Sequence, residues 1–244
     1  MKTVIFVLTA LATLTFQHAD FKQEQLKYSR VRIAYAEKES ILKKQYQILK
    51  QDLYYQKVLI RIFKQEKQVE IWSKNNVSKT FIHIKTWDIC AASGHLGPKR
   101  RQGDNQVPEG IYCIDRFNPN SNFYLSLGLN YPNASDKILS DKTYPGGDIF
   151  IHGACVSIGC VALTDDIIKE LYLICIEARQ HGQLNIPVHI FPFKMTEYNI
   201  KAYARTFPEH ANFWNNLQSI FSYWEENHNL PEISINAKGN YLIQ

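Results

Sequence analysis

Residues 147–165 read GDIFIHGACVSIGCVALTD, and this stretch indicates both the fold and the chemistry of the chain. Residues 149–151 are apolar and predict a short buried strand that ends at His152. Cys160 lies further along the chain, shortly before the expected cap of the next helix. The stretch therefore predicts a histidine and a cysteine held at the ends of neighbouring elements.

The pairing of Cys160 with His152 suits acyl transfer through a thioester. A reactive thiol needs a nearby base to lower its pKa, and the N-terminus of a helix adds positive potential. Gly159 lets the backbone approach a substrate and point N–H groups at a developing oxyanion. Spacing alone also permits a buried structural cysteine, or a zinc site made by His152, Cys155 and Cys160, although no paired-ligand spacing supports zinc.

The rest of the chain predicts an α+β fold with a mainly antiparallel or mixed sheet. Residues 20–56 are expected to be helical, because their apolar residues recur on one face. A helix is expected from Thr164 or Asp165 to about Gln180, and a later one covers residues 213–224. Short β-branched or aromatic runs predict strands at 58–63, 69–72, 81–84, 111–114, 123–129, 149–151 and 188–191.

Composition excludes several classes of protein. The chain has 244 residues, of which 45% are hydrophobic and 21% charged, so a globular core is expected rather than disorder. The net charge of +5 is uneven: residues 22–74 hold 13 Lys or Arg and 6 Asp or Glu, whereas residues 75–244 hold 14 and 16. Because acidic residues interrupt the basic segment, it is interpreted as a solvated helix face, and no nucleic-acid partner is expected.

The N-terminus and the cysteines indicate export. Residues 1–19 are interpreted as a signal peptide, since Lys2 precedes an apolar run too short for a comfortable membrane span. Export permits disulfides, and five cysteines leave at least one thiol unpaired within the chain. The alternatives for the others stay open: Cys90 and Cys113 could pair, Cys155 is a packing residue, a resolving thiol or a disulfide partner, and Cys175 is expected in the core.

Ile151-His152-Gly153 followed by Ser157-Ile158-Gly159-Cys160 resembles the active-site signature of the L,D-transpeptidase catalytic domain, the YkuD fold, and most closely its YafK-like branch. The resemblance implies a YkuD-like mixed, β-sandwich-like sheet with flanking helices and an N-terminal helical extension. Other segments that are similar to the family extend the resemblance from about residue 29 to the end of the chain. They are residues 29–38, 62–72, 94–100 with 103–112, 127–136, 186–196 and 213–214, with the tail through Tyr241.

The chain departs from the broader family pattern in two ways. His152 and Cys160 are only eight residues apart, and Ile158 stands where a second histidine is usual. Both departures are features of the YafK-like pattern, so they do not indicate loss of activity. No role is therefore transferred to this chain from that second histidine.

The resemblance implies a role for each residue of the motif. Cys160 is the implied nucleophile, and His152 is the implied general base and later acid. The backbone at Gly153 would orient the imidazole, and the N–H groups of Gly159 and Cys160 would form the oxyanion hole. Ser157 would shape the turn or assist His152.

Residues outside the motif are candidates for substrate contacts or structural roles. Lys99, Arg100 and Arg101 are candidates for contacts with carboxylates of a diaminopimelate-containing peptide, with a solvated basic loop as the alternative. Four other prominent side chains are expected to be structural, namely His189, Trp214, Phe221 and Trp224.

The expected protein is therefore a periplasmic or cell-envelope enzyme that forms a Cys thioester with peptidoglycan stem peptides. The acyl group would pass to an amine or to water, including release of a wall-anchored lipoprotein, with hydrolysis favoured. The alternative is a non-catalytic peptidoglycan-binding or scaffold protein on the same fold. No cofactor, no metal and no stable membrane span after signal removal are expected. The expected organisation is a signal peptide (1–19), an N-terminal helical extension (20–56), a catalytic domain (57–196) and a C-terminal helical extension packed on it (197–244).

Overall fold

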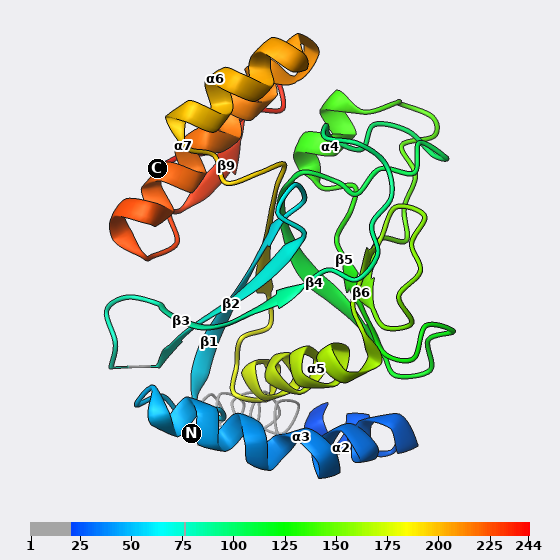
Figure 1. Cartoon of the computed structure of the whole chain (residues 1–244), viewed down its shortest axis with the longest axis vertical. Coiled ribbons are helices and arrows are strands. Elements are labelled where there is room, and N and C mark those ends of the chain that lie inside the picture. Colours follow the sequence, from blue (N-terminus) through cyan, green and yellow to red (C-terminus); the bar gives the residue numbers. More distant parts are fainter. Residues whose placement is uncertain (1–20, 76) are drawn as a thin grey trace, which may run out of the picture.

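A curled, eight-stranded mixed sheet forms the centre of the computed structural model, which describes residues 21–75 and 77–244 (Figure 1). The predicted signal peptide lies outside the described residues. The strand order is β3-β2-β1-β8-β4-β5-β6-β7. The strands are β1 (Gln56–Phe63), β2 (Gln68–Asn75), β3 (Ile82–Asp88), β4 (Gly110–Asn118), β5 (Ser126–Leu129), β6 (Phe150–His152), β7 (Val161–Ala162) and β8 (Ile186–Phe191).

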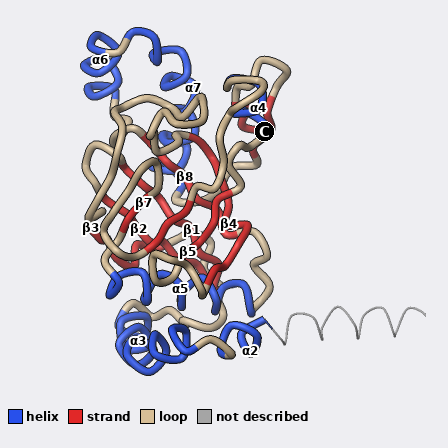
Figure 2. The backbone as a smooth tube through the Cα atoms, turned by 90° about the vertical axis from the view of Figure 1, so that its right-hand side faces the viewer, coloured by secondary structure: helices blue, strands red, loops and turns tan. Residues whose placement is uncertain are grey.

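Helices lie at both ends of this sheet, as Figures 1 and 2 show from two directions. One group contains α2 (Phe21–Leu26), α3 (Ser29–Ile48) and α5 (Asp165–Gln180). The other contains α6 (Glu197–Thr206), a 3-10 turn (Pro208–His210) and α7 (Ala211–Asn227). A short helix α4 (Ala134–Leu139) follows β5, and β9 (Ile233–Ile235) pairs with β10 (Tyr241–Ile243) after α7.

Strand β1 is buried on both faces, which explains why its sequence is apolar almost without interruption. Val58, Ile60 and Ile62 pack in the core shared with α3 and α5. Leu59 packs with Trp224 of α7, and Phe63 packs with the other aromatic residues on that side. Alternate side chains of one strand therefore join the two helical groups to a single sheet.

The N-terminal helices are fixed to α5 by a buried carboxylate. Glu177 is 1% exposed and accepts hydrogen bonds from Lys22 Nζ and Tyr35 Oη, both at 2.6 Å. Burying a carboxylate costs free energy, and the ammonium and the hydroxyl offset that cost at one of its oxygens. The basic segment is thus partly used in docking α2 and α3 to the rest of the chain.

The expected α+β class with a mixed sheet and an N-terminal helical segment is confirmed. The helix after the motif runs from Asp165 to Gln180, and the Thr164 hydroxyl accepts from the Ile167 N–H at 3.2 Å as its cap. Three elements differ from expectation. In place of one helical segment over residues 20–56, the described residues form two helices, of which the second ends at Ile48. Helix α4 was not predicted, and β7 separates Cys160 from the helix cap.

Helix α4 has a sequence signal that explains it. The side chain of Asn133 accepts from the Asp136 N–H at 2.9 Å, and the Asp136 carboxylate accepts from the Asn133 N–H at 3.2 Å. This reciprocal capping box satisfies two N–H groups that would otherwise lack partners at the start of a helix.

No helix in the described part of the chain is long and apolar enough to cross a membrane.

Candidate active site

The parallel pairing of β6 with β7 brings the histidine and the cysteine together. Ile151 pairs with Val161, and His152 pairs with Ala162. Extending this register by one residue places Cys160 opposite Phe150. Side chains two residues apart on a strand share a face, so His152 and Cys160 lie on the same face of the pair. Both line one cleft of about 1140 Å3.

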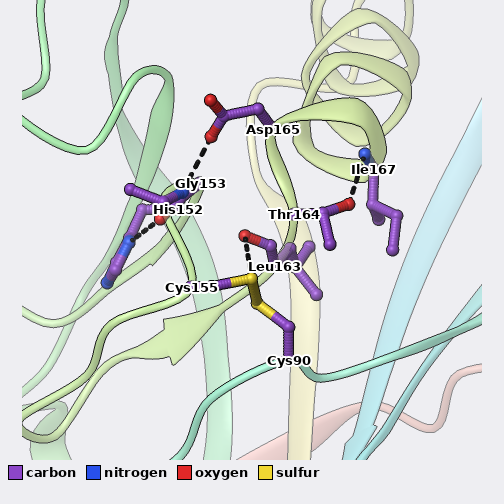
Figure 3. Close-up of a disulfide and its surroundings, with 9 residues drawn as sticks. Cys90, His152, Gly153, Cys155, Leu163, Thr164, Asp165 and Ile167 are labelled. Carbon is purple, nitrogen blue, oxygen red and sulfur yellow. Dashed lines mark hydrogen bonds between the residues drawn. A yellow bond between two sulfur atoms is a disulfide. The ribbon is translucent and has the colours of Figure 1, made fainter.

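The His152 ring has a fixed orientation. Its Nδ1 lies 2.6 Å from the carbonyl oxygen of Gly153, as Figure 3 shows. A carbonyl oxygen only accepts, so Nδ1 carries the proton and Nε2 retains its lone pair. The Phe123 ring lies 4.6 Å from the imidazole, centroid to centroid. Burial lowers the pKa of His152, opposed by the Gly153 hydrogen bond, so the imidazole is a neutral base.

The thiol of Cys160 is protonated in this arrangement. Burial raises its pKa above the usual value, and the charge of Asp148 adds to this, while a backbone hydrogen bond at Phe150 and the charge of Lys99 oppose it. The thiol also lies 3.8 Å from the Asp148 carbonyl oxygen. The expectation of a thiol pKa lowered by an adjacent helix N-terminus is wrong, because α5 starts only at Asp165, after β7.

A disulfide fixes the loop that joins His152 to Cys160. Cys155 is bonded to Cys90, which follows β3 (Figure 3). Ala154 and Cys155 both have positive φ, at 66° and 46°. The Asp165 carboxylate holds this bend by accepting from the Ala154 N–H at 2.8 Å. The first turn of α5 therefore supports the histidine side of the loop.

The disulfide decides between the alternatives left open for the cysteines. Cys155 is a disulfide partner, which was one of its three alternatives, rather than a packing residue or a resolving thiol. The suggested pairing of Cys90 with Cys113 is wrong, because Cys90 is bonded to Cys155 and Cys113 is free. A zinc site that uses the Cys155 thiolate conflicts with the disulfide as well. Cys160 keeps a free thiol, and Cys175 is buried in the core as expected.

Ser157 shapes the turn that carries the thiol. Its hydroxyl accepts from the N–H groups of Gly159 at 3.3 Å and Cys160 at 3.1 Å, and it donates to the Cys160 carbonyl at 2.7 Å. The two N–H groups expected to form an oxyanion hole are thus occupied by a serine hydroxyl. Gly159 has φ of +116°, which only glycine adopts without strain.

The three predicted basic residues have different environments. Lys99 lines the cleft but is 5% exposed, and its ammonium donates to Asp104 at 2.6 Å. Arg100 lies 3.3 Å from the Asp136 carboxylate and over the ring of Phe213, and it does not line the cleft. Arg101 does not line it either. Of the three, Lys99 alone is placed beside the candidate site.

A second cleft, of about 500 Å3, also reaches Cys160. The turn between β1 and β2, the segment after β3 and the α6 region form its walls. The thiol therefore lies where two clefts meet. The lining residues are Ile62, Lys64, Gln65, Lys67, Ile89, Ala92, Ser93, Gly94, His95, Leu96, Val107, Cys160, Val161, Tyr203 and Phe207.

Other prominent side chains are structural, as expected. His189 is buried in β8, and burial with the nearby charge of Arg61 lowers its pKa to about 3. The aromatic residues of α7 are buried in the two smaller cores. They are Trp214, Phe221 and Trp224.

Sequence reasoning missed two residues that position the histidine. Phe123 reaches His152 because the Gly153 N–H donates to its carbonyl oxygen at 3.1 Å, a contact between distant segments with no local signal. Asp165 had a signal, since an acidic residue in the first turn of a helix is common, but its bond to Ala154 depends on the fold.

Comparison with known proteins identifies the family of this chain. The L,D-transpeptidase catalytic domain family, YkuD, matches residues 57–190. The Escherichia coli (strain K12) protein named "Putative L,D-transpeptidase YafK" is 35% identical over 196 residues, which cover 80% of this chain and 76% of that protein. The solved structure of the helical cell shape determining protein Pgp2 from Campylobacter jejuni is similar with 17% identity and a TM-score of 0.45, over 75% of this chain and 74% of that one. The resemblance inferred from the motif is confirmed: the chain belongs to the L,D-transpeptidase catalytic domain (YkuD) family.

Proposed function

We propose that this chain is an exported cysteine acyltransferase of the cell envelope that acts on diaminopimelate-containing peptidoglycan stem peptides. The observation that carries the proposal is the shared face of β6 and β7, from which His152 and Cys160 enter one cleft. Family membership supports a peptidoglycan substrate. The signal peptide predicted from residues 1–19 supports a periplasmic location.

The first step is attack on the carbonyl carbon of a stem-peptide amide. Cys160 Sγ forms the C–S bond as its proton passes to Nε2 of His152, which the Gly153 carbonyl keeps available. Rotation of the Ser157 hydroxyl frees the N–H groups of Gly159 and Cys160 for the oxyanion. His152 then returns the proton to the leaving amine, and a thioester remains on Cys160.

The acyl group of the thioester is then transferred to water or to a second amine, which releases the Cys160 thiol. We favour hydrolysis of an L,D or lipoprotein-anchoring amide, on the motif's resemblance to the YafK-like branch. Purified protein should be incubated with lipoprotein-linked sacculi and, separately, with free tetrapeptide muropeptides. Release of lipoprotein without new cross-links supports hydrolysis, whereas a muropeptide dimer would identify a cross-linking enzyme.

Labelling with a carbapenem tests the nucleophile before any natural substrate is known. We expect an adduct on Cys160 by mass spectrometry, lost in Cys160→Ala and strongly slowed in His152→Ala. Cys113→Ser is the matched control, because Cys113 is also a free, half-buried thiol but lies outside both clefts. A wild-type Cys160 that stays unlabelled would favour the non-catalytic peptidoglycan-binding or scaffold alternative.

A further inference from the structure

The loop between β4 and β5 reaches the histidine of the candidate active site. Residues 119–125 form this loop, and part of it lines the larger cleft. The Phe123 ring lies 4.6 Å from the imidazole of His152, centroid to centroid. The loop also holds the backbone beside the imidazole, because the Gly153 N–H donates to the carbonyl oxygens of Phe123 at 3.1 Å and Leu125 at 3.3 Å. The orientation of His152 therefore depends on where this loop lies.

The backbone of this loop has an uncommon conformation. Tyr124 has a φ of +70°, in the left-handed region that residues other than glycine rarely adopt. Such a conformation costs free energy and persists only where the surrounding contacts hold it. Tyr124 directly follows Phe123 in the chain, so the contacts that hold Tyr124 also decide where the Phe123 ring lies.

The N-terminal helix supplies these contacts through one arginine. Nη1 of Arg30, in the first turn of α3, donates to the carbonyl oxygens of Ser121 at 2.5 Å and Tyr124 at 2.6 Å. The guanidinium also lies 5.6 Å from the centre of the Tyr124 ring. Hydrogen bonds from a charged donor are stronger than those between neutral groups. A single side chain thus ties two carbonyl groups of the loop to α3.

A second cation, from α5, contacts the same tyrosine. Lys169 Nζ lies 5.6 Å from the centre of the Tyr124 ring and donates to the carboxylate of Glu37, on α3, at 2.6 Å. A cation at this distance from an aromatic ring is attracted by the ring quadrupole. The position of the loop is therefore set by the packing of α3 against α5.

We propose that Arg30 is a positioning residue of the active site, which holds the loop between β4 and β5 so that Phe123 packs on His152. Arg30 lies outside the residues 57–190 that match the family, and it lines neither cleft at Cys160. It therefore acts through the loop and not on a substrate. This inference rests on the proposed role of His152 as the general base, and it makes the N-terminal helices part of the catalytic unit.

The pKa of His152 tests the assignment without any substrate. Burial lowers this pKa, so a loop that moves away from the imidazole should let it rise toward its usual value of 6.5. The pKa is measured on the full chain by NMR titration of the imidazole C–H signals, assigned with His152→Gln. We expect the rise in Arg30→Met, and a smaller one in Arg30→Lys, whose ammonium still donates hydrogen bonds.

Arg32 provides the matched control on the same helix. Its Nη1 also donates to two carbonyl oxygens, those of Leu26 at 2.9 Å and Lys27 at 2.7 Å. These carbonyls lie where α2 joins α3, and not in the active-site loop. Arg32→Met should therefore leave the pKa of His152 unchanged. Equal rises in Arg30→Met and Arg32→Met would assign the effect to a loosened α3 and would overturn the proposal.

A second substitution tests the path from Arg30 to the imidazole. Phe123→Leu removes the ring but keeps the carbonyl groups to which the loop owes its position, and it should also raise the pKa of His152. The double variant with Arg30→Met should raise this pKa by less than the sum of the two separate changes, because both act through the same ring. Additive changes would mean that the two residues act independently, and would refute this path.

Carbapenem acylation links the positioning to the proposed function. At saturating carbapenem the rate constant for acylation of Cys160 should fall about tenfold in Arg30→Met, as a misplaced catalytic group allows, while the fraction of protein that reacts stays unchanged. A purely structural role would lower the reacting fraction and leave the rate constant and the pKa of His152 as they are.

The two readouts separate failure of the positioning from failure of the proposed function. A raised pKa of His152 in Arg30→Met, with no acylation of even the wild type, would leave the positioning of the imidazole standing and refute the acyl transfer. Acylation of the wild type, with the same rate constant and the same pKa in Arg30→Met, would do the reverse.

Discussion

The Nδ1 atom of His152 lies 2.6 Å from the carbonyl oxygen of Gly153, the residue that follows it in the chain. This contact assigns the ring proton to Nδ1 and leaves Nε2 free toward the cleft that Cys160 also lines. Burial lowers the pKa of the imidazole and raises that of the thiol. The two groups that share this cleft are therefore a neutral base and a neutral thiol.

The pH dependence of Cys160 alkylation by a small electrophile should show that the thiol and the imidazole are both neutral at rest. Because burial raises the pKa of the thiol above its usual value, the alkylation rate with iodoacetamide should keep rising into the alkaline range, without a plateau near neutrality. Carbapenem acylation should instead persist to below pH 6.5, because burial lowers the pKa of His152. A plateau of alkylation between pH 5 and 8 would mean that an imidazolium–thiolate pair exists at rest.

Gly159→Ala should slow acylation at least tenfold. An L residue at φ of +116° is strained by about 1–3 kcal/mol, and its Cβ would lie 3.3 Å from the Gln106 carbonyl oxygen. The strain would distort the turn that carries Cys160. Gly147→Ala is the control, since Gly147 lines the same cleft and its added Cβ meets nothing within 4 Å. Equal rates for the two variants in single-turnover carbapenem acylation would contradict the prediction.

Removing the disulfide should destabilise the protein and loosen the active-site loop. Cys90 and Cys155 are separated by 65 residues, so chain entropy predicts a loss of about 4 kcal/mol in Cys90→Ser/Cys155→Ser. Urea unfolding of the double variant, compared with Cys113→Ser, measures this loss. Thiol counting on the unfolded wild type should give three reactive cysteines before reduction and five after it. Five before reduction would refute the bond.

Acid should destabilise the fold through His189. Its pKa is lowered to about 3 by burial and by the charge of Arg61, so the unfolded chain, with a histidine pKa near 6.5, binds the proton more tightly. Stability is full above pH 6.5 and is lost as the pH falls, by about 2 kcal/mol at pH 5. His189→Leu should show a smaller loss between pH 7.5 and 5 in urea unfolding. If His189→Leu showed the same pH dependence as the wild type, the effect would belong to other groups. His152 is one of them, because its pKa is also lowered and its protonation also destabilises the fold.

Local sequence signals predicted the helices and strands whose caps and apolar faces are encoded within the segment itself. The helix from Asp165 to Gln180 could be predicted because the Thr164 cap and its apolar face are encoded within the segment itself. Helix α4 was missed although the Asn133–Asp136 capping box was present. The short strand β7 could not be predicted, because two residues carry no periodicity and the strand exists only through its pairing with β6.

The sequence by itself determined the family, the α+β class and the candidate thiol and imidazole, because motif residues and their spacing are local properties. Only the tertiary structure decided what surrounds them. The Cys90–Cys155 bond, the Phe123 ring on His152 and the second cleft at Cys160 join segments far apart in the chain. The protonation state of the pair was decided there as well, because burial in the folded chain, rather than residue type, shifts both pKa values.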